Sequence, residues 1–192
     1  MINCQFRTIP IGNSNCNGSK KQFMGDVQNL AANDAVEKIR EIAKDANICM
    51  FVTDLKKLPL DARPMATQEV DDEGNIWFMS DRNSNKHADI KHDDRVQLFY
   101  SQTGNYEYLS VFGRAELIDD RDKIEELWTS MAKTWFKEGK DDPNIQLIKV
   151  IPEDAYYWDT KNSKMVSLVK FAMGAIGITP KDDGGIEGTL KV

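Results

Sequence analysis

The chain has 192 residues, a net charge of −6 and a sequence pI near 5.0, with 41% hydrophobic and 29% charged residues. This composition is typical of a globular protein that is long enough to bury a sizeable core. The acidic balance argues against a protein that coats nucleic acid or an anionic membrane, and no apolar run approaches the roughly 20 residues that span a bilayer.

Residues 1–30 are rich in Asn, Gly, Ser, Gln and Lys and show no hydrophobic periodicity. We therefore expect a flexible N-terminal lead-in, followed by one domain over residues 31–192. The lead-in lacks the charged start and continuous apolar core of a signal peptide. The three cysteines, Cys4, Cys16 and Cys49, do not form a disulfide framework. These features predict a cytoplasmic protein, in which Cys49 packs as a small hydrophobe.

Hydrophobic periodicity and turn residues predict the order of the elements. The first is a helix over residues 34–46, where Asp34 and Glu37 have the spacing of a capping box. The expected strands are 48–53, 65–70, 76–80, 96–101, 108–117 and 145–159, the last interrupted at Pro152. Helices are expected over 84–93, from Ile124 to Trp135 and over 165–175, followed by a loose tail over 182–188.

The strand over residues 108–117 has the clearest pattern. Its odd positions are Leu109, Val111, Gly113, Ala115 and Leu117, whereas the even positions are mostly polar or aromatic. This period of two predicts one buried face. In the helix that follows, the aromatic and aliphatic stripe at helical spacing is interpreted as core packing.

These short strands are joined by hairpin turns and carry helices at their ends. Alternating βαβ units are absent from the pattern, so a doubly wound parallel sheet is not expected. The sequence instead predicts a mainly β protein with helices (α+β), built as a closed or split antiparallel barrel of six strands.

One segment has the pattern of a phosphate site. The apolar strand 76–80 leads into a polar turn, Ser84 stands at the expected N-cap of the next helix, and Lys86 lies just inside it. Free backbone N–H groups at a helix start, a hydroxyl and an ammonium together suit a phosphate. An ordinary capped helix after an ordinary strand explains the same residues, so both interpretations stay open at this point.

The usual catalytic patterns are absent from the sequence. His87 and His92 are five residues apart with no Cys or carboxylate pattern around them, which argues against a metal site. There is no Walker loop, no G-x-G-x-x-G and no G-x-S-x-G. Any chemistry is therefore expected to come from a bound cofactor.

Several motifs in order carry a resemblance to a known family. They are Ala62-Arg63-Pro64-Met65, an acidic turn with Gly74, Trp77-Phe78-Met79-Ser80-Asp81, Ser84-Asn85-Lys86, Gly113-Arg114-Ala115 and Tyr156-Tyr157-Trp158-Asp159. In this order the chain resembles the pyridoxamine 5′-phosphate oxidase-like superfamily. Within it, the chain is most similar to the general stress protein family of FMN-binding split barrels. The resemblance covers about residues 33–192.

The resemblance implies a six-stranded antiparallel split β-barrel that forms a homodimer with FMN at the subunit interface. It implies that Arg63, Ser84 and Lys86 hold the phosphate, with Asn85 beside them, and that Ser80 bonds the phosphate or the ribityl chain. The isoalloxazine would be lined or hydrogen-bonded by a group made of Pro64, Met65, Phe78 and Met79. Trp158 would approach the flavin from the partner subunit.

Two departures from the oxidase pattern limit what the resemblance implies. The segment Thr160-Lys161-Asn162-Ser163-Lys164-Met165 has no arginine or histidine, where true oxidases hold their vitamin B6 substrate. Asn85 and Gln68 stand where the oxidase often has basic residues, which predicts weaker phosphate binding.

Three functional hypotheses follow from this pattern. The first is an FMN-dependent oxidoreductase with a role in stress physiology, an unidentified small-molecule redox partner and no vitamin B6 oxidase activity. The second is a non-catalytic flavin-binding or sensing protein. The third is a deazaflavin or haem ligand in the same cleft.

Overall fold

The computed structural model describes residues 26–130, 132–160 and 185–191, and it contains one barrel with three helices around it. Residues 1–25 of the expected lead-in and the helix expected over 165–175 lie outside the described residues. The helices are α1 (Asn33–Ala46), α2 (Asn85–His92) and α3 (Arg121–Leu127). The barrel strands are β3 (Ile48–Thr53), β4 (Asp61–Val70), β5 (Ile76–Asp81), β6 (Arg95–Gln102), β7 (Glu107–Ile118) and β8 (Ile145–Thr160).

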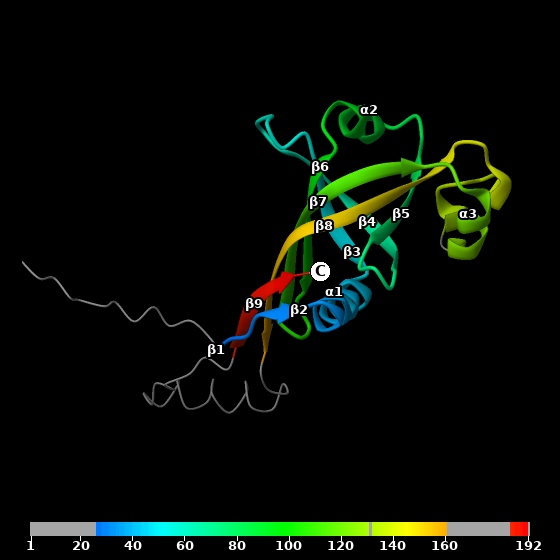
Figure 1. Cartoon of the computed structure of the whole chain (residues 1–192). Helices are drawn as coiled ribbons and strands as arrows, with labels where there is room; N and C mark the ends of the chain where they lie inside the picture. Colours follow the sequence, from blue (N-terminus) through cyan, green and yellow to red (C-terminus); the bar gives the residue numbers. More distant parts are fainter. Residues whose placement is uncertain (1–25, 131, 161–184, 192) are drawn as a thin grey trace, which may run out of the picture.

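The six barrel strands pair in the order β8-β5-β4-β3-β6-β7, and β7 returns to pair with β8. All of these pairs are antiparallel, so the predicted six-stranded antiparallel barrel is confirmed and closed. Figure 1 shows α1 toward one end of the barrel and α2 toward the other. Within the described ranges, no helix is long and apolar enough to cross a bilayer.

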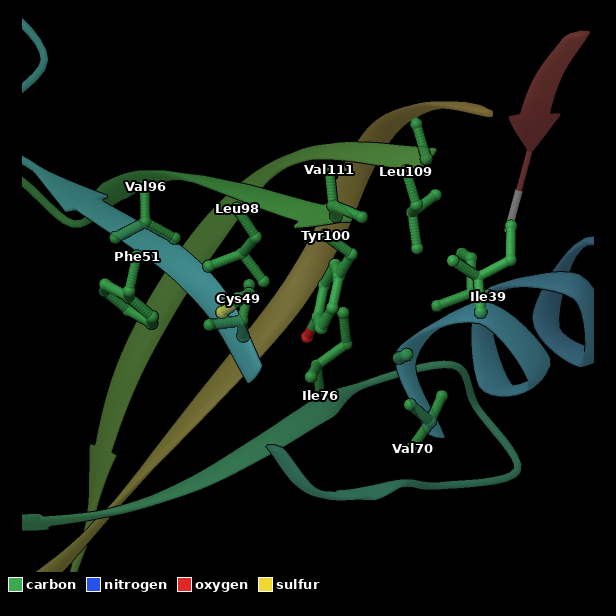
Figure 2. Packing of buried hydrophobic residues seen from close by; sticks show 14 of the residues in the cluster. Ile39, Cys49, Phe51, Val70, Ile76, Val96, Leu98, Tyr100, Leu109 and Val111 are labelled. Carbon is green, nitrogen blue, oxygen red and sulfur yellow. The ribbon is translucent and has the colours of Figure 1, made fainter. Parts of the chain in front are cut away.

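The barrel interior is a hydrophobic core to which all six barrel strands contribute. The alternation predicted for β7 is confirmed, because Leu109, Val111 and Ala115 are buried and face this core. Figure 2 shows side chains from several strands gathered around the ring of Tyr100, with Ile39 of α1 beside them. Cys49 is buried there as predicted, and burial raises the pKa of its thiol to about 12, so it packs as an unreactive side chain.

The interruption predicted at Pro152 is a bulge within a continuous strand. Gly113 lies opposite Pro152, and Phe112 lies opposite Asp154, so Glu153 is an extra residue on β8. A Cβ on Gly113 would lie 2.3 Å from the carbonyl oxygen of Ile151, a distance that no side chain tolerates. The glycine is therefore required by the close approach of two backbones.

The two ends of the described chain meet beside the barrel. The strand β9 (Gly185–Lys191) pairs antiparallel with β8, and β1 (Asp26–Val27) and β2 (Leu30–Ala31) pair parallel with β9. The sequence had predicted lead-in up to residue 30 and a loose tail over 182–188, so residues 185–188 of that tail are corrected to strand. These pairings join distant segments, which local periodicity does not detect.

The start of α1 also differs from the prediction. The helix begins at Asn33, its N-cap is Ala32, and no side chain among the described residues caps it, so the capping box predicted at Asp34 is wrong. The N–H of Ala32 donates to the carbonyl of Lys191 at 2.8 Å. The pairing with β9 thus continues up to Ala32 and fixes where the helix can begin.

The helix α3 is shorter than predicted. It ends at Leu127, and Trp128 is already in an extended conformation. Two short 3-10 turns follow, η1 (Ala132–Thr134) and η2 (Gly139–Asp141). This turn of the chain lets Phe136 pack with Ile124 and Leu127 in a second hydrophobic cluster. The single helical stripe predicted through Trp135 is therefore wrong, and Trp135 is 67% exposed.

Candidate functional site

A cavity of about 410 Å³ lies between β4 and β5 on one side and the segment that joins α3 to β8 on the other. Its volume is within the range of small-molecule sites. Six of the residues that the sequence predicted for a cofactor line it: Arg63, Pro64, Met65, Met79, Ser80 and Lys86. The antiparallel pairing of β4 with β5 brings the first five together, and α2 supplies Lys86.

The Arg63 guanidinium is held on one side only. Its Nη2 donates to Thr53 Oγ1 at 2.9 Å and to the Asp61 carbonyl at 3.1 Å, and it lies 3.6 Å from Asp89 Oδ2. Its Nη1 is buried, and no hydrogen-bond partner for it exists among the described residues. A buried donor without a partner is costly in free energy. Since Arg63 lines the cavity, an anionic ligand there can satisfy this donor.

Lys86 is the second cation of the site. Ser84 is the N-cap of α2 as predicted, but its hydroxyl caps no backbone group and instead accepts a hydrogen bond from Lys86 Nζ at 3.0 Å. Burial lowers the pKa of Lys86, and the positive charge of Arg63 lowers it further, against the opposite effect of Asp81. In the part of the chain that the structure describes, Lys86 has no ion pair within 4.0 Å. An added anion would relieve this repulsion.

The rest of the cavity is largely apolar. One wall is formed by strand residues, with Pro64 and Met65 of β4 and Met79 of β5. The opposite wall comes from the α3–β8 connection, through Thr129, Ala132, Trp135 and Phe136. Phe136 is anchored in the second hydrophobic cluster, whereas Trp135 stands exposed at the cavity. Two walls of this kind suit a flat ring.

The sequence did not predict this second wall. The helical spacing of Trp128 and Trp135 favoured core packing, and that interpretation removed Trp135 from the candidate site. Gly139, with φ +81°, lies beyond Trp135, so it gave no sign in the sequence that the helix ends at Leu127. Ala66, Gln68 and Asp81 also line the cavity without having been predicted as cofactor residues.

Four predicted residues do not line the cavity. The Phe78 side chain is fully buried and packs edge-on against Phe51, with ring centroids 5.2 Å apart. Ser84 reaches the site only through its hydrogen bond with Lys86, and Asn85 is exposed at the start of α2. Trp158 is exposed on the outer wall of β8, where it lies opposite Tyr108.

The arrangement combines a cationic end with two apolar walls. Such a cavity can bind a ligand that has one anionic group and one flat apolar group. Among the described residues, no three His, Cys, Asp or Glu side chains lie close enough together to hold a metal ion.

The chain is similar to a known family over most of its length. Residues 34–182 match the family described as "Pyridoxamine 5′-phosphate oxidase like". Among curated proteins, the chain is 25% identical to protein bli-3 of Neurospora crassa over 136 residues, which are 66% of this chain and 65% of that protein. It is 27% identical to general stress protein 26 of Bacillus subtilis over 96 residues, which are 48% of this chain and 68% of that protein.

Solved structures show the same fold. A structure from Jannaschia sp. CCS1 superposes with a TM-score of 0.68 at 23% identity and covers 84% of this chain and 99% of its own. The general stress FMN/FAD binding protein of Xanthomonas citri gives a TM-score of 0.58 at 25% identity, covering 67% of this chain and 90% of its own.

Proposed function

The chain belongs to the pyridoxamine 5′-phosphate oxidase-like family, and from this premise we propose that it binds FMN in the cavity between β4, β5 and the α3–β8 connection. In this proposal the phosphate is held by Arg63 and Lys86. The isoalloxazine lies between the wall formed by β4 and β5 and the opposite wall, which includes Trp135 and Phe136. Bound FMN supplies hydride exchange at its ring, which the side chains of this cavity cannot provide.

The observation that carries the proposal is the cationic end of the cavity. Arg63 Nη1 is buried without a partner, and the pKa of Lys86 is lowered by burial and by Arg63. A phosphate accepts a hydrogen bond from Arg63 and offsets the repulsion between the two cations, whereas an uncharged ligand such as riboflavin cannot offset that repulsion. The similarity to the FMN/FAD binding protein of Xanthomonas citri supports the same ligand class.

We infer a redox role in stress physiology rather than vitamin B6 oxidation. Relatives of this chain include general stress protein 26 of Bacillus subtilis. The segment Thr160-Lys161-Asn162-Ser163-Lys164-Met165 offers no arginine or histidine for a second phosphorylated substrate. The FMN-loaded protein should therefore exchange hydride with another small molecule and produce no pyridoxal 5′-phosphate.

We also propose a homodimer in which Trp158 of one subunit approaches the flavin of the other. Met50 and Phe99 are paired across β3 and β6, and Tyr108 and Trp158 are paired across β7 and β8, and all four are at least 38% exposed. Met50 also lies opposite Pro64, so this apolar face of the barrel reaches the rim of the cavity. Apolar surface of this extent usually marks an interface, and a twofold dimer is its commonest form.

The proposed function is tested by a visible spectrum of the purified protein and by mass spectrometry of the released ligand. We expect a flavin spectrum, a mass equal to FMN, and weaker binding of riboflavin to the flavin-free protein. A haem or deazaflavin spectrum would overturn the cofactor, and equal affinity for FMN and riboflavin would overturn the phosphate site. Oxidation of NADPH by the loaded protein would favour the enzyme over a non-catalytic flavin-binding protein.

A further inference from the structure

A fully buried hydroxyl lies directly behind the cationic end of the cavity. Thr53, the last residue of β3, is 0% exposed and does not line the cavity. Its Oγ1 donates to Asp89 Oδ2 at 2.7 Å and accepts from Arg63 Nη2 at 2.9 Å. The hydroxyl therefore bridges a carboxylate on α2 and a guanidinium on β4, two elements that are far apart in the sequence.

The bridge has a direction, because a hydroxyl has a single hydrogen to donate. Asp89 takes that hydrogen, so the lone pairs of Thr53 Oγ1 face Arg63. Once Nη2 is bound in this way, the planar guanidinium has its orientation fixed, and Nη1 is left as the unpaired donor.

We propose that Thr53 and Asp89 are positioning residues, which hold the Arg63 guanidinium so that its Nη1 faces the ligand phosphate. This inference rests on the proposed binding of FMN. Neither residue touches the ligand, and both act through Arg63.

Asp61 is the other anchor of Arg63, and it holds the guanidinium less firmly. Its Oδ1 lies 2.9 Å from Nη2, but its side chain is 45% exposed, compared with 23% for Asp89. Exposed ion pairs are screened by solvent and fix geometry poorly. The hydroxyl of Thr53 is shielded from water, so its loss removes the bond to Asp89 and the shielded bond to Arg63 Nη2 together and leaves Nη2 with Asp61 alone at hydrogen-bond distance.

Asp89 also links the two cations of the site. It lies three residues after Lys86 on α2, so the two side chains share one face of this helix. The helix that carries Lys86 thus also anchors Arg63. The distance between the two cations is fixed by the docking of one helix against β3, which keeps the phosphate site assembled before a ligand enters.

Thr53→Val tests the proposal, because it removes the hydroxyl with almost no change in volume and no change in charge. We expect FMN to bind about tenfold more weakly, which is the effect of one oriented hydrogen bond to a charged group, and riboflavin to bind as before. Thr53→Ser, which keeps the hydroxyl, should keep the preference for FMN. Thr67→Val is the matched control, since it removes the bond between Thr67 Oγ1 and Tyr100 at 2.8 Å, away from Arg63.

Asp89→Ala gives a second test whose sign is decisive. If Asp89 acted only as a negative charge near the phosphate, its removal would strengthen FMN binding. If Asp89 positions Arg63 through Thr53, its removal should weaken FMN binding and leave riboflavin unaffected. Asp89→Ala can also serve as the test if Thr53→Val fails to fold, because Asp89 is only partly buried and its truncation disturbs the core less.

A double-mutant cycle with Arg63→Lys tests whether Thr53 acts on FMN affinity through Arg63. In the Arg63→Lys background, Thr53→Val should produce no further loss of FMN affinity. A full additive loss, or an equal loss of FMN and riboflavin, would overturn the positioning role.

If the wild-type protein bound neither flavin, the proposed function would fall. The guanidinium NMR spectrum of the ligand-free protein would then test by itself whether Thr53 holds Arg63. Restricted rotation of the Arg63 guanidinium that is lost in Thr53→Val supports the bridge, and unchanged rotation overturns it.

Discussion

Replacement of Lys86 by alanine tests whether the cationic end of the cavity holds a phosphate. The Lys86 ammonium has Ser84 Oγ as its hydrogen-bond partner at 3.0 Å, and Arg63 is its cationic neighbour in the cavity. Truncation removes one of two cations and changes no wall of the apolar part of the cavity. We expect Lys86→Ala to weaken FMN and to leave riboflavin almost unaffected.

The size of the effect follows from the chemistry of this contact. A hydrogen bond to a charged group contributes roughly 1.5–3 kcal/mol to binding. Lys86 is partly exposed, so solvent screening places the contact at the lower end of that range. The dissociation constant for FMN should therefore rise about tenfold to thirtyfold, since each 1.4 kcal/mol corresponds to about a factor of ten.

Quenching of flavin fluorescence on binding measures both dissociation constants in the same buffer. Lys91→Ala is the matched control, because Lys91 is exposed in the last turn of the same helix and does not line the cavity. It should change FMN binding by less than about twofold at physiological salt, where exposed charges are screened. If Lys86→Ala weakened FMN and riboflavin equally, Lys86 would not hold the phosphate.

The remaining predictions concern stability, the core and the dimer. Burial lowers the pKa of His87, so the unfolded chain binds more protons below about pH 6.5, and the stability contributed by neutral His87 is lost as the pH falls from there. Urea unfolding should show this loss flattened in His87→Gln but retained in His92→Gln, a change at the exposed histidine; an unchanged slope in His87→Gln would contradict it. Phe78→Leu should lower the free energy of unfolding by about 1 kcal/mol without changing FMN affinity, because the ring faces the core. A loss of FMN affinity in a correctly folded Phe78→Leu protein would place Phe78 at the flavin. Trp158→Ala should lower FMN affinity and abolish the rise in thermal midpoint that FMN causes in a dimer, and light scattering from a wild-type monomer with full FMN occupancy would refute a shared site.

The sequence predicted the barrel well because most of its strands alternate locally. In β7 the buried residues recur at every second position, and the turn at Thr103-Gly104-Asn105 marks where β6 gives way to β7. The N-cap at Ser84 was equally local, since a strand, a polar turn and a helix follow one another there. Such signals need no knowledge of distant parts of the chain.

The candidate site was only partly predictable. Arg63 and Lys86 were found because they belong to short motifs, but the Trp135 wall depends on where α3 ends, and its helical spacing gave the opposite indication. The role of Thr53 had no sequence signal, because its partners are Arg63 on the neighbouring strand and Asp89 on a helix more than thirty residues away. Propensity and periodicity describe neighbours in sequence, whereas these contacts arise from tertiary packing.

The meeting of β1, β2 and β9 has a consequence for the order of folding. Leu30 pairs with Leu190, and Tyr157 of β8 donates its hydroxyl hydrogen to the carbonyl of Gln28 at 2.9 Å. During synthesis the segment over residues 26–31 emerges early, yet its partner strand emerges roughly 160 residues later, which takes about ten seconds or more at ribosomal speed. The barrel strands β3–β8 leave the ribosome within that interval, so their core can form first. The segment over residues 26–31 is therefore expected to dock last, because it can pair only after β9 has left the ribosome.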